Sequence, residues 1–178
     1  MIEIVQRDNP VLREHASPVP ASEIASDKTR KIVSEMKSAM SSQKDGIAIA
    51  APQLGYSLQI FVVSGTLLTE ADPSYEGGED DLVFFNPTIT KRSREKKDVE
   101  EGCLSVRWLY GRVKRSTRVT LEALDESGKK VVRGASGLLA QIFQHETDHL
   151  NGILFTDTAT DVWEMTEEEI EELQNQKA

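Results

Sequence analysis

Apolar residues recur at helical spacing in two separate stretches of the chain. In the first, from about Asp27 to Ser42, they fall on one face as Ile32, Val33, Met36, Ala39 and Met40. The second precedes residue 145 and contains Leu138, Leu139, Ile142 and Phe143. Asn151-Gly152 then supplies a typical helix end just after Leu150. The pattern therefore predicts one amphipathic helix in each stretch.

Short or alternating apolar runs predict strands near Gln59–Val63, Leu82–Asn86 and Thr117–Leu124. The turn residues of 125–128 lead from the last of these into Lys130–Arg133, which predicts a β-hairpin. We expect an α+β fold with mainly antiparallel β-sheets packed around a central helix, formed as a single catalytic domain over residues 1–178. The acidic end, about 166–176, reads as a helix whose first turn is closed by a Thr166–Glu169 capping box.

Charge is unevenly distributed along the 178 residues, which carry a net charge of −9. Residues 91–118 hold ten Lys/Arg against four acids, whereas residues 157–178 hold eight acids against one lysine. The overall balance argues against specific nucleic-acid binding. The basic stretch is either a rim that faces ribosomal RNA or a set of solvated strands, and we favour the solvated strands. No stretch approaches 18 apolar residues, and a single cysteine fits a reducing compartment, so we expect a cytoplasmic, monomeric protein without membrane contact.

The most informative stretch is 144–149, which reads Gln-His-Glu-Thr-Asp-His. His145 and His149 stand four residues apart and so lie on one face of the predicted helix, where they can bind one divalent metal. The adjacent Glu146 can then act as general base toward a metal-bound water. An accidental match is the alternative for the bare pattern. However, the chain has only three histidines, and two of them fall within this motif.

A third metal ligand is available in Cys103, the only cysteine, which stands between Gly102 and Leu104. A free cysteine is most often a small buried apolar residue. Here acids and a glycine precede it and Ser105 follows, a setting that suits a ligand loop better than a core strand. Thiolate coordination would also explain why the cysteine has no disulfide partner.

Residues 45–55 form a run of small residues that contains one amide side chain, Gln53. The plain interpretation is a tight loop leading into the strand near Gln59–Val63. The functional interpretation is that small residues let a substrate backbone approach closely, while the amide donates a hydrogen bond to a developing oxyanion. Taken alone, this segment does not decide between the two interpretations.

Together the three segments resemble the signature motifs of the peptide deformylases, in the same order along the chain. Glu101 to Ser105 and Gln144 to His149 match two of these motifs completely. The third is present as Gly46, Ala50, Ala51 and Gln53, with Ala48 where the family has its second glycine. The resemblance covers about residues 1–158.

The resemblance implies a metal-dependent hydrolase that removes the N-formyl group from the initiator methionine of nascent peptides and releases formate. By similarity, Cys103, His145 and His149 hold the metal, usually Fe²⁺ in this family and replaceable by Ni²⁺, Co²⁺ or Zn²⁺. Glu146 is implied as general acid/base, and Gln53 with the backbone N–H of Leu104 as oxyanion donors. The substrate is an N-formylmethionyl peptide, and the ribosome is a possible partner.

Candidates for substrate contact are Gly46, Ile47, Ala48, Leu104 and Ile142, although ordinary core packing explains the apolar ones equally well. Ala48 and Arg107, which stands where many family members have proline, depart from the family pattern near the expected pocket. We interpret both residues as altering the shape of the substrate pocket without inactivating the enzyme.

Two alternatives remain open at this level. One is a zincin-like peptidase whose third ligand is a carboxylate after the helix, such as Glu164. The other is a relative of the deformylases that binds metal but is catalytically silent because of Ala48 or Arg107.

Overall fold

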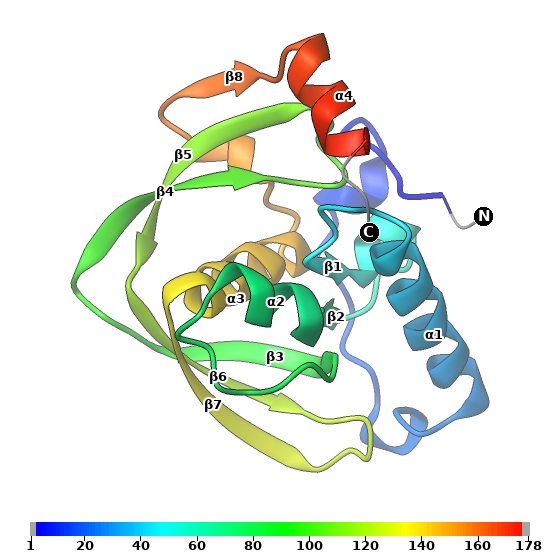
Figure 1. The fold of residues 1–178 in the computed structure, drawn as a ribbon. Coiled ribbons are helices and arrows are strands. Elements are labelled where there is room, and N and C mark those ends of the chain that lie inside the picture. Colours follow the sequence, from blue (N-terminus) through cyan, green and yellow to red (C-terminus); the bar gives the residue numbers. More distant parts are fainter. Residues whose placement is uncertain (1–2, 176–178) are drawn as a thin grey trace.

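Two antiparallel sheets enclose one central helix in the computed structural model, which describes residues 3–175 (Figure 1). The five-stranded sheet has the order β1-β2-β3-β6-β7 and consists of Ala48–Ala50, Ile60–Val63, Leu82–Arg92, Arg118–Leu124 and Lys130–Ser136. The three-stranded sheet has the order β4-β5-β8 and consists of Lys96–Gly102, Leu109–Ser116 and Val162–Glu164. The predicted α+β class with antiparallel pairing is confirmed.

The described part of the chain contains the helices α1 (Asp27–Ser41), α2 (Gly65–Ala71), α3 (Gly137–Leu150) and α4 (Glu167–Asn175). Short 3₁₀ turns occur at Pro10–Arg13, Ala21–Glu23, Ala51–Leu54 and Phe155–Asp157. The bounds of α1 agree with the sequence prediction to within one residue, and all five of its predicted apolar residues are buried. Among the described residues, no helix is both long enough and apolar enough to span a membrane.

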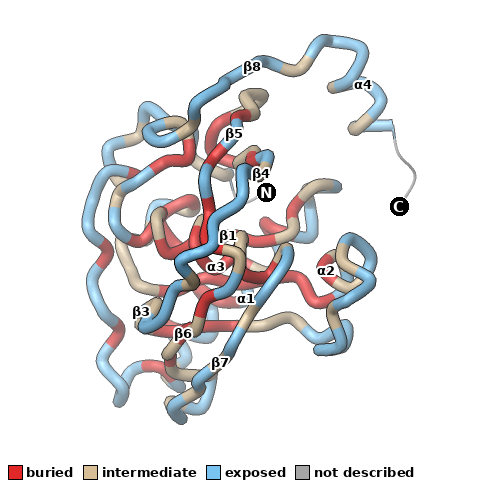
Figure 2. Tube along the Cα trace, turned by 90° about the vertical axis from the view of Figure 1, so that its left-hand side faces the viewer, coloured by how far each residue is buried: buried red, intermediate tan, exposed pale blue. Residues whose placement is uncertain are grey.

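The central helix α3 lies between the two sheets (Figure 1). Its core-facing residues, including Leu139, Ile142 and Phe143, pack against buried residues of β1, β2, β3 and β6. Rings of Phe61, Phe84 and Phe143 contact one another at centroid distances of 5.1–6.0 Å. Figure 2 shows this buried centre surrounded by exposed loops and strand ends. Aromatic packing on one face thus fixes the orientation of the helix that carries both histidines.

The ends of α3 are set by long-range contacts as well as by local sequence. The carboxylate of Asp72, which follows α2, accepts a hydrogen bond from the backbone N–H of Leu138 in the first turn. At the other end the chain reverses at Gly152, whose φ of +73° favours glycine, as the predicted stop signal requires. A Cβ at Gly152 would also lie 2.6 Å from the carbonyl oxygen of Arg13. Both features hold α3 at one position along its axis.

Several elements differ from the sequence prediction. The strand predicted near Leu82–Asn86 continues to Arg92, and two further strands, β4 and β5, follow it within the basic stretch. The helix α2 was not predicted.

The acidic helix α4 begins after Thr166, and the predicted capping box is present: Glu169 accepts from the Thr166 backbone N–H at 2.8 Å and its own N–H donates to the Thr166 hydroxyl. Residue 176, the predicted end of this helix, lies outside the described residues.

Candidate metal centre and active site

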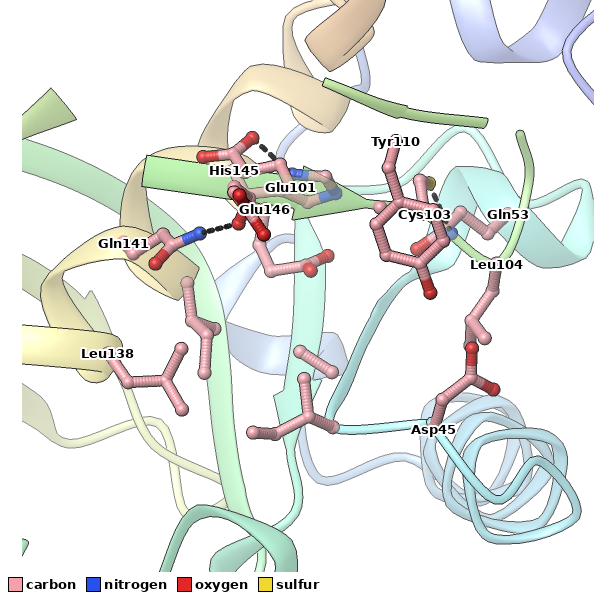
Figure 3. A pocket seen from close by; sticks show the side chains of 15 residues that line it. Asp45, Gln53, Glu101, Cys103, Leu104, Tyr110, Leu138, Gln141, His145 and Glu146 are labelled. Carbon is pink, nitrogen blue, oxygen red and sulfur yellow. Dashed lines mark hydrogen bonds and ion pairs between the residues drawn. The ribbon is translucent and has the colours of Figure 1, made fainter. Parts of the chain in front are cut away.

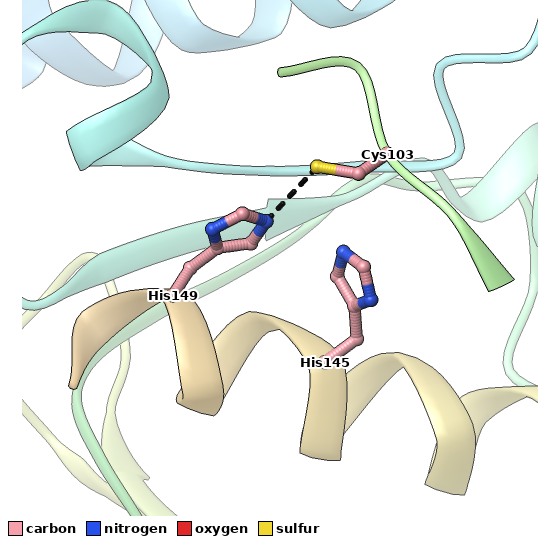
Figure 4. A group of neighbouring side chains, drawn as sticks. All are labelled: Cys103, His145 and His149. Atoms are coloured by element: carbon pink, nitrogen blue, oxygen red, sulfur yellow. Dashed lines mark hydrogen bonds between the residues drawn. The ribbon is translucent and has the colours of Figure 1, made fainter. Parts of the chain in front are cut away.

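His145 and His149 occupy successive turns of α3 and point toward Cys103, which follows β4 (Figure 4). The two imidazole rings have their centroids 4.9 Å apart. The Sγ atom of Cys103 lies 3.1 Å from Nε2 of His149. One donor atom from each of the three residues lies within 4.8 Å of the other two. The structure therefore brings together the three side chains that the sequence singled out as metal ligands.

The donor set and its spacing fit a divalent transition metal. A tetrahedral ion about 2.3 Å from sulfur and about 2.1 Å from nitrogen places those two atoms roughly 3.6 Å apart. The distances in this group bracket that value. Burial lowers the pKa of His149 well below its ordinary value, so the ring is neutral and offers a lone pair. Within residues 3–175, no second group of three such side chains comes this close together.

A buried ion pair between Glu101 and Arg115 supports His145 through its Nδ1 atom. The Nδ1 atom of His145 lies 2.9 Å from a carboxylate oxygen of Glu101, and this carboxylate also accepts two hydrogen bonds from Arg115 at 2.7 and 2.9 Å. Arg115 in turn contacts Asp148 at 2.6 Å. Burial alone would raise the pKa of Glu101, but the hydrogen bonds from Arg115 and His145 outweigh it and lower this pKa to about 2. Glu101 is therefore a permanent anion that holds His145 through Nδ1, so that the other ring nitrogen is the one available to the Cys103 side of the group.

Glu146 is a buried carboxylate beside this group. Its Oε2 atom is buried and has no hydrogen-bond partner among residues 3–175. Burial raises the pKa of Glu146 to about 7, and the nearby anions Glu101 and Asp148 add to the effect, against an opposing contribution from His145. A carboxyl group with a pKa close to neutral can both accept and release a proton.

A cavity of about 210 Å³ opens onto these residues (Figure 3). Of the predicted substrate and oxyanion residues, Ile47, Ala48, Gln53, Leu104 and Ile142 line it. The remaining one, Gly46, does not line the cavity. A Cβ at Gly46 would lie 2.2 Å from the carbonyl oxygen of Met40, so this glycine is explained by close packing against the end of α1. The other lining residues were not singled out from the sequence for this cavity: Asp45, Glu100, Glu101, Gly102, Tyr110, Leu138 and Gln141.

Gln53 is almost completely buried at one wall of this cavity. Its Oε1 atom accepts a hydrogen bond from the backbone N–H of Ala50 at 2.8 Å, which fixes the orientation of the amide. The Nε2 group then points to Ser105 Oγ at 3.2 Å and Cys103 Sγ at 3.5 Å. The amide donor is therefore held beside the candidate ligand cysteine.

Glu101 and Arg115 are the main residues that sequence reasoning missed. Glu100 and Glu101 stand side by side in the chain, and only the strand register separates their roles: Glu101 is buried and Glu100 is exposed. Gln144 and Asp148, which belong to the matched 144–149 motif, make different contacts. Asp148 holds Arg115, whereas Gln144 pairs with the backbone N–H and C=O of Ser116, anchoring α3 to β5.

The carboxylate alternative for the third ligand is wrong for Glu164. This residue is exposed on β8, where it pairs with Leu109, and it is not part of the Cys103–His145–His149 group.

A cysteine and two histidines gathered around one point, beside a buried glutamate and an open cavity, define the class of metal-dependent hydrolases. Comparisons with known proteins narrow this class. The family model described as Polypeptide deformylase matches residues 1–164. Peptide deformylase 2 of Clostridium acetobutylicum is 40% identical over 154 residues, covering 86% of this chain and 92% of that protein.

Solved structures agree with the sequence comparisons. Peptide deformylase from Thermotoga maritima superposes with a TM-score of 0.78 at 32% identity, covering 90% of this chain and 99% of that one. The class I type b peptide deformylase from Acinetobacter baumannii bound to Met-Ala-Ser gives a TM-score of 0.78 at 33% identity, with 89% and 98% covered. The chain therefore belongs to the peptide deformylase family. The predicted enzyme class and reaction, removal of the N-formyl group from nascent peptides, are confirmed.

Proposed function

We propose that Cys103, His145 and His149 hold one divalent metal ion and that this ion is Fe²⁺, with Ni²⁺, Co²⁺ or Zn²⁺ able to replace it. The observation that carries the proposal is the convergence of three donor atoms within 4.8 Å from two separate elements. Thiolate and imidazole donors suit this group of metals. When bound, the ion would supply Lewis acidity, lowering the pKa of a water from about 15.7 to about 7 and polarising a carbonyl.

Glu146 is the general acid/base in this proposal. Its free, buried Oε2 atom and its pKa of about 7 allow it to take a proton from the attacking water. The same carboxyl group then returns that proton to the departing amine, whose release completes cleavage of the formyl C–N bond. Because Glu101 keeps its charge through contact with Arg115, Glu146 is the carboxylate in the cavity suited to proton exchange at neutral pH.

Gln53 and the backbone N–H of Leu104 are the proposed donors to the formyl oxygen as it gains negative charge. Both residues line the cavity, and the Gln53 amide is fixed in orientation by Ala50. Preorganised donors of this kind contribute roughly 3–4 kcal/mol to transition-state stabilisation. Leu104 also follows Cys103 directly, which places its N–H next to the proposed ligand.

The methionine side chain would lie against the apolar wall formed by Ile47, Ala48, Leu104, Leu138 and Ile142. A flexible thioether chain packs well on such a surface. The Acinetobacter baumannii relative was solved with the peptide Met-Ala-Ser bound, which is the form of a deformylated product. N-formylmethionyl peptides are therefore the proposed substrates. Ala48 lines the pocket and Arg107 contacts its lining residue Asp45, and neither removes a proposed ligand.

The proposed cellular location follows from the chemistry of the cysteine ligand. A free cysteine that must remain a thiolate ligand requires a reducing compartment, which supports a cytoplasmic location. Action as a monomer on chains emerging from the ribosome stays a prediction. The helix α4 carries five glutamates in Glu167–Asn175, so it is unsuited to docking on RNA phosphates by charge attraction.

Formate release from formyl-Met-Ala-Ser tests the proposal, using protein prepared anaerobically with Fe²⁺ or reconstituted with Ni²⁺. We expect turnover in the parent protein and in His15→Ala, whose exposed histidine lies outside the site, and none in Cys103→Ala. Metal bound at one equivalent without turnover in the parent protein would favour the silent relative. Full activity in Cys103→Ala would refute the proposed ligand set.

A further inference from the structure

An ion pair joins two loops at one wall of the active-site cavity. Arg107, in the loop between β4 and β5, forms a two-pronged contact with the carboxylate of Asp45, in the loop after α1; one of the two contacts, Nη2 to Oδ1, measures 2.9 Å. The same guanidinium donates to the Gln43 side chain at 3.1 Å and lies 4.4 Å over the Trp108 ring. This planar, two-pronged geometry holds the guanidinium against Asp45.

The pair lies away from the reacting groups but within the same cavity. Asp45 lines the cavity together with Leu104 and Tyr110, and Figure 3 shows it well separated from His145 and Glu146, beyond Leu104. Asp45 and Arg107 also line a second cavity of about 270 Å³, which is bounded further out by Leu173 of α4. The ion pair thus separates the active-site cavity from an outer one, and both of its side chains are only partly buried.

Methionine occupies apolar lining residues in the proposed function, and Asp45 is one of the polar residues of the same cavity past which the following peptide residues can leave. We propose that the Asp45–Arg107 pair determines specificity for those residues: Arg107 cancels the charge of Asp45, and the mouth of the cavity therefore selects weakly between acidic and basic substrates. This inference rests on the proposed function. It assigns a role to Arg107, one of the two positions where the chain departs from its family pattern.

The direction in which each variant changes the preference between basic and acidic substrates depends on which charge of the pair is left uncompensated. Without Arg107, the Asp45 carboxylate attracts a basic substrate residue and repels an acidic one. Without the Asp45 charge, the remaining guanidinium does the opposite. Other charged residues nearby set the starting preference of the parent protein and are unchanged in the variants: Glu100 lines the active-site cavity, Arg112 pairs with Glu100, and Lys44 lines the outer cavity. Each single variant should therefore shift the preference from this starting value in its own direction.

The test is a charge cycle with two substrates, formyl-Met-Lys-Ser and formyl-Met-Glu-Ser. We expect Arg107→Ala to raise the ratio of their kcat/KM values (Lys over Glu) by about tenfold at low ionic strength, because an uncompensated charge changes each rate a few-fold in opposite directions. Asp45→Asn should lower the ratio by a similar factor, and the double variant should return it close to that of the parent. The effect should reside mainly in KM and should shrink in about 1 M salt.

A purely structural role for the pair would give a different result. Loosening of the two loops would slow both substrates alike and leave the ratio unchanged in all three variants, which would overturn the inference. Shifts of the same sign in both single variants would overturn it as well. Turnover of formyl-Met-Ala-Ser by the parent protein is measured in parallel, so that failure of the proposed function is distinguished from failure of this inference.

Discussion

The Nδ1 atom of His145 lies 2.9 Å from the Glu101 carboxylate, so the imidazole has one side held by an anion and the other directed at Cys103. A carboxylate in this position keeps the ring proton on Nδ1 and leaves the Nε2 lone pair available to a metal. Since Glu101 is itself fixed by Arg115, the orientation of the proposed ligand is built into the fold.

Replacing Glu101 by glutamine should weaken metal binding by roughly 10–100-fold, because the neutral amide supports the imidazole less well and leaves Arg115 without its main anion. The measurement is a competition titration against a chelator with Zn²⁺ or Co²⁺. Glu100→Gln is the matched control, since it changes the neighbouring exposed acid and should leave affinity unaltered. Equal affinities for both variants would contradict the orienting role.

The regular, locally encoded elements could be predicted from the sequence. In α1 and α3 the apolar spacing marks the buried face, and the Asn151-Gly152 stop marks where α3 ends. The hairpin of β6 and β7 follows from alternation and from the turn residues of 125–128. The grouping of Cys103, His145 and His149 was also predictable, because two of the three histidines stand at helical spacing and the chain has one cysteine.

Elements that depend on distant partners could not be predicted in the same way. The strand β4 reads Lys-Lys-Asp-Val-Glu-Glu-Gly, a charged sequence with little strand propensity, and it exists through pairing with β5 along its whole length. The contact between Arg107 and Asp45 joins residues 62 positions apart and has no local signal. Nor does the sequence show that Gly46 serves packing rather than the cavity, because this depends on where the Met40 carbonyl lies.

Gly46→Ala should destabilise the protein by about 1–3 kcal/mol, because the added Cβ would meet the Met40 backbone carbonyl at 2.2 Å and backbone cannot move cheaply. Chemical denaturation monitored by circular dichroism measures the free energy of unfolding. Gly134→Ala in β7 is the control: a Cβ there meets no atom within 4 Å, so stability should change little. If the two variants were equally stable, the packing explanation for Gly46 would be wrong.

The ion pair between Arg13 and Asp157 predicts a pH dependence of stability. Its atoms lie 2.5 and 3.2 Å apart, and Asp157 also accepts from the Leu154 N–H; the hydrogen bond from Arg13 is the main reason that the pKa of Asp157 is lowered. Stabilisation by a carboxylate of lowered pKa is present above its unfolded pKa of about 3.9 and is lost as the pH falls through the folded value. Both side chains are partly exposed, so we expect roughly 0.5–1 kcal/mol at pH 7.

Asp157→Asn measures this contribution through thermal unfolding at a series of pH values. The difference in stability from the parent should be constant near neutrality and should decrease as the pH falls below about 4. Arg13→Gln and the double variant complete a thermodynamic cycle that isolates the pair. A difference that stays constant down to pH 2 would show that the charge of Asp157 contributes nothing.

The central claim is that Glu146 moves the proton in a site whose metal is held by other residues, and Glu146→Gln tests it most directly. Metal content and formate release from formyl-Met-Ala-Ser are measured on the same preparation of the variant and of the parent protein. We predict one equivalent of metal in both and a rate lower by roughly 10²–10⁴-fold in the variant, the range expected for loss of general acid/base catalysis. Near-normal turnover by the metal-loaded variant would contradict the account.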